Sequence, residues 1–330
     1  MLPAQRRRLL PAEWSLLPVA FAAAGLLLLL APPAAMGDAV QVGQVEAELV
    51  AELSQVVPGQ PFTAGLRLRM EDQWHVYWRN PGDAGLPPKL TWNLPPGFSV
   101  GEIQWPHPDK FDVPPLMSYG YHGEVLLPVT ITPPDNLRPD ELVTLKATAE
   151  WLVCKEECIP GKADLSLTLP VGSGTAPVND EWAPLFATAR EKVPLPTGDW
   201  QVTGAADESS IIIDMIAPDW LTVTLSEITF IPFDKLIIEN AADQQLTRTL
   251  DGYRLTVERS HYAEGIPDTL RGILVTESGW RGEGSEKALT FEVAVDGAPS
   301  TTTAATTADS NAGDFSRAIL FAFLDRKSVV

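Results

Sequence analysis

Two cysteines, Cys154 and Cys158, are the residues of this 330-residue chain best suited to chemistry, and the chain has no others. A disulfide used as a staple acts mainly by restricting the unfolded chain, and a loop of about five residues gains only roughly 2 kcal/mol. A chain of this length can bury an adequate core without such a link. The pair therefore favours thiol–disulfide exchange, with a plain structural disulfide as the alternative.

A metal site is a third interpretation of the pair, since the spacing is similar to the short Cys-x-x-x-Cys copper loop of cytochrome oxidase subunit II. Copper would also need His or Met ligands. The histidines are His75, His107, His122 and His261, and none follows the pair directly. We therefore expect no metal and no cofactor at the cysteines.

The pair must lie at a turn. Residues four apart in a strand are separated by roughly 13 Å, whereas the Cα atoms of a disulfide lie within about 7 Å of each other. Lys155–Glu157 must therefore turn sharply, and Ile159–Gly161 is expected to redirect the chain. A partner can reach such a turn, and the more exposed sulfur would receive its attack.

The charges around the pair oppose one another. Lys155 would lower the pKa values of the two cysteines, and Glu156 and Glu157 would raise them. This balance predicts exchange with a protein partner rather than attack on small molecules.

Two further segments are candidates for function. In Trp74–Pro88, the side chains of Trp74, Val76 and Trp78 would share one strand face, with His75, Tyr77 and Arg79 on the other. The segment is either a core strand that runs into a Pro-Gly turn, or a ligand groove or partner-docking face. Phe111–Tyr121 is interpreted as a long surface loop or as a lid over the cysteines.

The elements that position these residues are short strands between Pro and Gly turns, and they predict an all-β fold. Residues 40–171 hold five strands, and residues 199–296 hold five more. The predicted strands are Val45–Leu53, Thr63–Met70, Val125–Ile131, Val143–Trp151 and Ala163–Leu169, then Ile211–Ile216, Leu221–Leu225, Tyr253–Glu258, Leu270–Thr276 and Ala288–Val295. This spacing is typical of two β-sandwiches in tandem. Residues 172–198 form a linker with one helix, Asn179–Lys192, capped by Asn179 or Asp180 and ended by Pro194.

The N-terminal end of the chain predicts export. Residues 1–37 are typical of a secretory signal, with Arg6–Arg8 before the apolar run Leu16–Leu30; the alternative is a retained membrane anchor. Export would place the cysteines in an oxidising compartment. The net charge of −19 argues against nucleic acid or an anionic membrane surface as a partner.

The C-terminal end suggests a longer protein. Residues 297–314 are predicted to be a flexible linker. In residues 315–330, the apolar run Ala318–Leu324 is far shorter than the roughly twenty residues that span a bilayer. We expect a truncated transmembrane segment there.

Several ordered motifs carry a family resemblance. They are His75–Pro88, Gln104–Pro106, Tyr119–Tyr121, Glu124–Val129 and Trp151–Gly161. Together they resemble the N-terminal periplasmic domain of the thiol:disulfide interchange reductase DsbD, in the variant close to the copper-tolerance protein ScsB. The resemblance covers about Val45 to Val171, and Ile228–Asp234 with Ile238–Ala242 looks more loosely like the second region of the same proteins.

The resemblance implies immunoglobulin-like sandwiches in the periplasm of a Gram-negative bacterium, with a redox-active disulfide in the first. Such a domain takes electrons from an inner-membrane domain and passes them to periplasmic thioredoxin-fold proteins. By position, Cys158 would form the mixed disulfides and Cys154 would resolve them. A cap loop with an aromatic side chain covers the disulfide in the family, and Phe111–Tyr121 falls in that region. The competing hypotheses are a copper-handling module and a structural sandwich with an inert disulfide.

Overall fold

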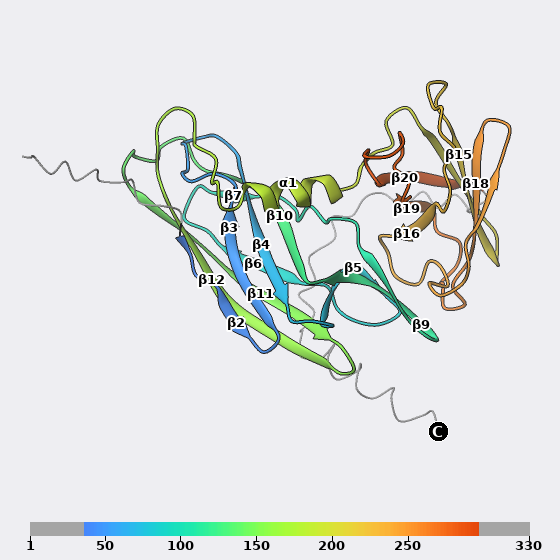
Figure 1. The fold of residues 1–330 in the computed structure, drawn as a ribbon, viewed down its shortest axis with the longest axis horizontal. Helices are drawn as coiled ribbons and strands as arrows, with labels where there is room; N and C mark the ends of the chain where they lie inside the picture. The colour runs from blue at the N-terminus through green and yellow to red at the C-terminus, as the bar shows by residue number, and fades with distance from the viewer. Residues whose placement is uncertain (1–35, 297–330) are drawn as a thin grey trace, which may run out of the picture. The chain divides into compact units, whose positions relative to one another are not determined.

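Strands β1 to β12 form two sheets that enclose one core in the computed structural model, which describes residues 36–296 (Figure 1). The seven-stranded sheet has the order β1-β12-β11-β5-β9-β8, with β6 also paired to β11, and the five-stranded sheet has the order β2-β3-β4-β10-β7. The strands are β1 Met36–Gly37, β2 Val40–Val42, β3 Val45–Ala51, β4 Phe62–Met70, β5 His75–Gly82, β6 Lys89–Asn93, β7 Ser99–Val100, β8 Asp109–Val113, β9 Leu116–His122, β10 Glu124–Thr132, β11 Leu142–Cys154 and β12 Cys158–Pro170. The prediction of an all-β, sandwich-like fold is confirmed.

Period-two alternation explains which side chains enter this core. On β5, Val76 and Trp78 are buried in the core between the sheets, whereas His75 and Tyr77 belong to the opposite face. On β11, Trp151 and Val153 face the same core, so Leu152 and Cys154 face outward. The prediction that Trp74, Val76 and Trp78 share the core face is therefore confirmed. The opposite face of β5 carries His75 and Tyr77 outside this core.

The hairpin of β11 and β12 differs from the prediction. Ile159–Gly161 does not redirect the chain but lies inside β12, in register with Trp151–Val153 of β11. Gly161 makes this possible, because a Cβ atom there would lie 2.3 Å from the buried Trp151 indole. The strands therefore continue to the cysteines, and the turn is confined to Lys155–Glu157.

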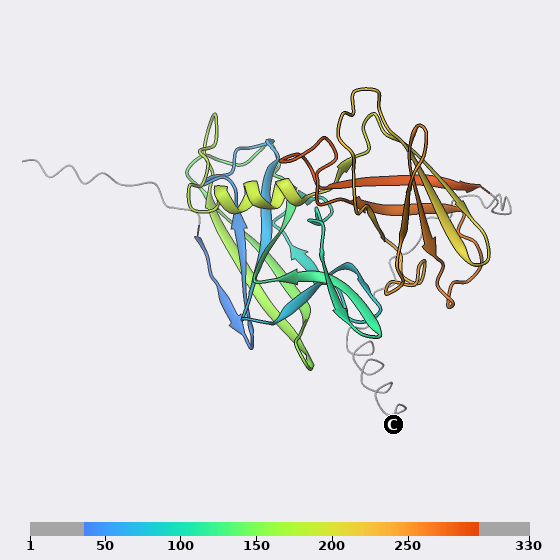
Figure 2. The ribbon, with the colours of Figure 1, turned by 45° about the vertical axis from the view of Figure 1, so that its right-hand side comes forward.

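Helix α1, Ala183–Lys192, covers the outer face of the five-stranded sheet through Phe186 and Ala189, which pack on Val50 and Leu126 (Figure 2). The helix is as predicted, but its N-cap is Trp182, so Asn179 and Asp180 as caps were wrong. Pro184 in the first turn sets the later start, and Asn179 instead accepts a hydrogen bond from the backbone of Glu181.

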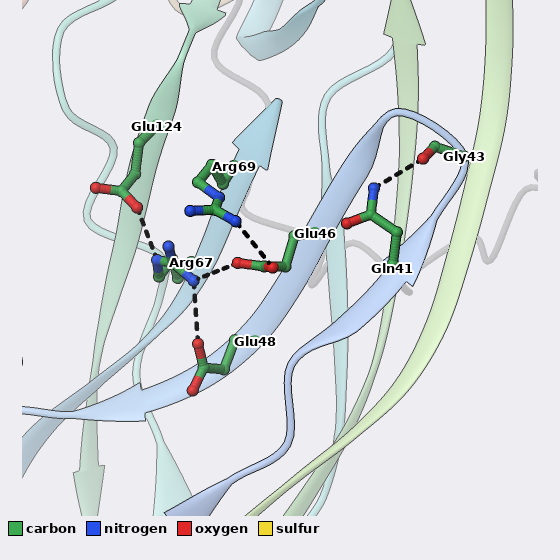
Figure 3. A network of polar contacts seen from close by, with 7 residues as sticks. All are labelled: Gln41, Gly43, Glu46, Glu48, Arg67, Arg69 and Glu124. Carbon is green, nitrogen blue, oxygen red and sulfur yellow. Dashed lines mark hydrogen bonds and ion pairs between the residues drawn. The ribbon is translucent and has the colours of Figure 1, made fainter. Parts of the chain in front are cut away.

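A charge network around the buried Arg67 lies on the same outer face (Figure 3). The Arg67 guanidinium on β4 binds Glu46 at 2.9 Å and Glu48 at 3.1 Å, both on β3, and Glu124 on β10 at 2.7 Å. Its carbon Cζ lies 5.3 Å from the ring centroid of Trp182, the N-cap residue of helix α1. The network thus joins the sheet to the helix.

Strands β13 to β20 build the second region around a separate core. Its eight-stranded sheet has the order β16-β19-β20-β14-β15-β18-β17, with β13 paired to β20. The core draws Ile213 from β15, Leu255 from β18 and Leu274 from β19, so the two ends of this sheet pack on each other. The strands are β13 Leu195–Pro196, β14 Gln201–Ala206, β15 Ser210–Ile216, β16 Thr229–Pro232, β17 Gln245–Arg248, β18 Gly252–Glu258, β19 Thr269–Val275 and β20 Ala288–Asp296.

The predicted strand Leu221–Leu225 is absent from the second region. The segment is a loop over the core instead, because the backbone N–H of Leu225 donates to the Tyr253 hydroxyl at 2.8 Å rather than to a neighbouring strand. Leu225 is buried by this arrangement.

The end of the Trp74–Pro88 segment contacts the second region. All described residues belong to a single compact unit. The buried Asn80 amide donates to the carbonyls of Pro232 at 2.8 Å and Asp234 at 3.1 Å, and Asn240 donates to Asp83 at 2.7 Å. Part of the Trp74–Pro88 segment, one candidate for partner docking, therefore contacts the second region of this same chain.

Three predicted parts of the chain lie wholly or mainly outside the described residues: the signal 1–37, the linker 297–314 and the stub 315–330. Of the first, only Met36 and Gly37 are described, and they pair with β12. No described helix is long and apolar enough to cross a membrane.

Candidate functional site

The two cysteines form a disulfide at the tip of the β11–β12 hairpin. Cys154 ends β11 and Cys158 begins β12, and the two are register partners with their Cα atoms 4.2 Å apart. The three residues between them are exposed, and the turn is closed by a hydrogen bond of 3.1 Å from the Lys155 N–H to the Glu157 carbonyl. The predicted turn at a strand end is confirmed.

The two sulfur-bearing residues differ in exposure. Cys154 is only 2% exposed, whereas Cys158 is half-buried. Both pack in a small apolar cluster with Tyr77, Leu152 and Leu86, separate from the main core. A reagent that approaches from solvent therefore meets Cys158 first.

The Tyr77 hydroxyl lies 3.7 Å from Cys158 Sγ. A disulfide sulfur carries no hydrogen, so the hydroxyl is the donor. Burial raises the pKa of Tyr77 to about 12, because the phenolate is poorly solvated in this cluster. Tyr77 therefore remains a neutral donor beside the sulfur over the whole physiological pH range.

One glycine makes room for the Tyr77 ring, and a second allows β9 to approach the backbone of β5. Gly85, at a φ of 107°, lies so close to the phenol ring that a Cβ atom there would be 2.3 Å from it. Gly120 is the register partner of Tyr77 on β9, where a Cβ atom would meet the Val76 carbonyl at 2.1 Å. The loop Gly82–Gly85 thus packs against the Tyr77 ring, whose hydroxyl lies beside Cys158 Sγ.

Four side chains form a row across four neighbouring strands. His122 on β9 is the register partner of His75 on β5, His75 is the partner of Cys154 on β11, and Cys154 is the partner of Cys158 on β12. Direct partners in antiparallel strands project to the same face, with Cβ atoms about 4.5–5.5 Å apart. The row therefore leads from two imidazoles to the two sulfurs.

Strand β8 contacts the imidazole end of this row. Phe111 stacks on His75 with ring centroids 4.5 Å apart and meets His122 edge-on at 6.2 Å. Asp109, on the same strand as Phe111, lies 3.0 Å from His122 Nδ1. Burial, and secondarily the charge of His122, lower the pKa of His75. His75 is thus a neutral imidazole at neutral pH.

The β8–β9 hairpin corrects the prediction of a long surface loop at Phe111–Tyr121. The segment is ordered into β8 and β9, because Asp109–Val113 pairs with Leu116–Gly120. Phe111 of this hairpin stacks on His75, the register partner of Cys154. The contact is consistent with the lid hypothesis, which stays a prediction.

The copper hypothesis finds no support in the residues that the structure describes. No group of three or more His, Cys, Asp and Glu side chains among them is placed to hold a metal ion. The cysteines are joined to each other, and the adjacent His75 ring stacks on Phe111 and meets Tyr77 edge-on.

Comparison with known proteins identifies the first region. The profile of the family described as "Thiol:disulfide interchange protein DsbD, N-terminal" matches residues 44–170. The crystal structure of the N-terminal periplasmic domain of ScsB from Proteus mirabilis aligns with a TM-score of 0.56 and 18% identity, over 79% of this chain and 98% of that chain. Residues 44–170 form a DsbD/ScsB-like N-terminal domain. At this identity, the ScsB structure supports the fold alone.

Two other aligned structures are the periplasmic chaperone SfaE, at 12% identity over 75% of this chain and 98% of that one, and the CsuC–CsuE chaperone–adhesin complex from Acinetobacter baumannii, at 10% identity over 76% and 98%. Their TM-scores of 0.17 and 0.18 are too low to indicate a shared fold. No curated protein matches the sequence significantly.

In this DsbD/ScsB-like N-terminal domain, the structure brings together more than the predicted pair. Cys154 and Cys158 were predicted as the site, and they are joined as a disulfide. The sequence singles out Tyr77, His75 and Phe111 only as parts of two conspicuous segments. In the structure Tyr77 and His75 lie beside the pair, and Phe111 stacks on His75. Strand alternation signals that His75 and Tyr77 share a face, but the sequence carries no sign of which strand lies beside them.

Proposed function

We propose that this chain is a periplasmic thiol–disulfide electron relay, a part of a protein-disulfide reductase, that acts through Cys154 and Cys158. It would receive electrons from an inner-membrane domain and pass them to periplasmic thioredoxin-fold proteins. The observation that carries the proposal is the disulfide at an accessible hairpin tip with unequal exposure of its two cysteines. The match of residues 44–170 to the DsbD N-terminal family supports the same chemistry.

The two cysteines would have separate roles. A donor dithiol first reduces the disulfide, which takes up two electrons and two protons. Cys158, the more exposed residue, then attacks the disulfide of a thioredoxin-fold partner as a thiolate and releases one partner thiolate. Cys154 attacks Cys158 Sγ, expels the second partner thiolate and restores the Cys154–Cys158 disulfide. The partner is reduced by two electrons and this chain is oxidised by two.

Single-cysteine variants test these roles. Reduced Cys154→Ala is expected to form a covalent adduct with an oxidised thioredoxin-fold protein, visible by non-reducing electrophoresis and mass spectrometry, because no second thiol resolves it. Cys158→Ala is expected to form little adduct, since Cys154 is buried. The reverse pattern would overturn the assignment of roles.

An inert structural disulfide is the outcome that would refute the proposal as a whole. It would appear as a reduction potential well below about −300 mV in a glutathione titration, since such bonds resist physiological reductants. Wild-type protein would then also fail to transfer electrons to any thioredoxin-fold protein.

A further inference from the structure

His75 is the titratable side chain next to the buried cysteine. It is the register partner of Cys154, and the paired residues project to the same sheet face. Its ring lies between Phe111, stacked at 4.5 Å, and Tyr77, edge-on at 5.2 Å, so its orientation is fixed from both sides. Neither contact uses a ring nitrogen as a hydrogen-bond partner.

Cys154 needs such a neighbour in the reduced state. The residue is 2% exposed and packs against Leu152 and Tyr77, and burial in apolar surroundings disfavours a thiolate. Only the thiolate attacks a disulfide. The Tyr77 hydroxyl is placed at the other sulfur, 3.7 Å from Cys158 Sγ. Resolution by Cys154 therefore requires a base close to it.

We propose that His75 is the general base for Cys154 in the resolving step, an inference that rests on the proposed function. In the mixed disulfide, a neutral His75 imidazole takes the proton of the Cys154 thiol. The resulting thiolate attacks Cys158 Sγ, the bond from Cys158 to the partner sulfur breaks, and the partner leaves as a thiolate. The imidazolium then returns its proton to water.

The charged and titratable groups around His75 suit this role. His122 faces it from β9 and is held by Asp109 of β8, Tyr77 lies on its own strand, and Cys154 lies on β11. The hairpin tip beyond Cys154 adds Lys155, Glu156 and Glu157. Burial and the charge of His122 both favour neutral His75, which is the form able to accept a proton.

The test separates the two steps of thiol–disulfide exchange in the full chain. Reduced protein is mixed with one equivalent of the aromatic disulfide DTNB, and thionitrobenzoate release is followed by stopped flow. The first phase reports attack by Cys158, and the second reports expulsion of the second thionitrobenzoate by Cys154. The variant is His75→Phe, which keeps an aromatic ring in the stack with Phe111 but has no nitrogen.

We expect His75→Phe to slow the second phase at pH 7 by roughly 100-fold, the lower end of the usual general-base contribution. Its second phase should then rise only at the higher pH where the Cys154 thiol ionises unaided, while its first phase stays within about threefold of wild type. His75→Gln should slow the second phase in the same way. Agreement between the two variants would show that the effect does not come from a packing defect of one replacement.

The matched control is His122→Gln, which removes the next imidazole in the row but leaves His75 beside Cys154. Its second phase should stay fast at pH 7. The inference is overturned if both His75 variants keep a second phase within about threefold of wild type with the same pH profile, or if they slow both phases equally. Failure of wild type to release the second thionitrobenzoate would instead refute the proposed function.

Discussion

The Tyr77 hydroxyl donates a hydrogen bond to Cys158 Sγ at 3.7 Å, from β5 to the first residue of β12. The contact lies at the more exposed cysteine, and the ring that makes it is buried. After reduction, the same donor faces a thiol or thiolate. Because hydrogen bonding to a charged form favours that form, Tyr77 should stabilise the Cys158 thiolate.

Tyr77→Phe is therefore expected to raise the pKa of the Cys158 thiol. A hydrogen bond to a charged group is worth about 1.5–3 kcal/mol, which corresponds to roughly one to two pKa units. The phenol of Tyr77, with a pKa of about 12, stays protonated throughout the titration. The measurement is the pH dependence of iodoacetamide alkylation on a Cys154→Ala background, where Cys158 is the single thiol.

Tyr262→Phe is the control for this prediction, because that phenol is 77% exposed and lies in the second region. It should leave the alkylation profile unchanged. An unchanged profile for Tyr77→Phe would mean that the hydroxyl has no role at the reduced site.

The sequence predicted the hairpin tip for a physical reason: two cysteines four residues apart can be joined only if the chain turns between them. It did not predict that β12 continues through Pro160 and Gly161, since both residues are typical turn formers. The strand continues because Trp151 occupies the space next to Gly161, and that contact depends on the register of the two strands.

The surroundings of the disulfide could not be predicted from local patterns. His75 and Tyr77 share a face by alternation alone, but β5 lies beside β11 only in the folded sheet, about eighty residues away in sequence. Phe111 reaches His75 because β8 pairs with β9 and β9 pairs with β5. Such a site depends on long-range strand order, which local patterns of alternation and turn residues do not specify.

Phe111→Ala tests whether the β8–β9 hairpin restricts access to the site. Phe111 holds the hairpin to His75 through a stacked contact of 4.5 Å. An aromatic pair contributes about 0.5–1.5 kcal/mol beyond its buried area, so its loss should raise the open population by up to about tenfold. Reduction of the disulfide by dithiothreitol should accelerate by a similar factor, measured under pseudo-first-order conditions.

Leu116→Ala is the matched control, since Leu116 lies on the same hairpin and is 44% exposed. Its reduction rate should equal that of wild type. Equal rates for Phe111→Ala and wild type would refute the lid hypothesis and leave Phe111 as a packing residue of His75.

The network around Arg67 predicts an unusual response of stability to pH. Burial is the main cause that raises the pKa of Glu48, against the opposing charge of Arg67. Burial opposes the charge of Arg67, but the hydrogen bonds that its guanidinium donates to Glu124 and Glu46 raise its pKa above the usual value. Arg67 thus remains charged, whereas burial disfavours the ionised form of Glu48 beside it.

Glu48→Gln is therefore expected to increase the free energy of unfolding at neutral pH. A carboxyl group whose pKa is raised on folding contributes stability below its unfolded value, near 4.5, and that stability is lost as pH rises through the folded value. Gln does not ionise, so the variant avoids this loss while keeping an acceptor for Arg67. The gain should vanish below about pH 4, in urea unfolding measured across pH.

Arg67→Met and Glu71→Gln are the comparison variants for this prediction. Removing the guanidinium, which is 9% exposed, leaves three carboxylates close together and should cost about 3–5 kcal/mol. Glu71 is exposed, and its replacement should change little. If Glu48→Gln instead lowers stability at neutral pH and not at acid pH, then the attraction between Glu48 and Arg67 outweighs the burial of the Glu48 carboxylate.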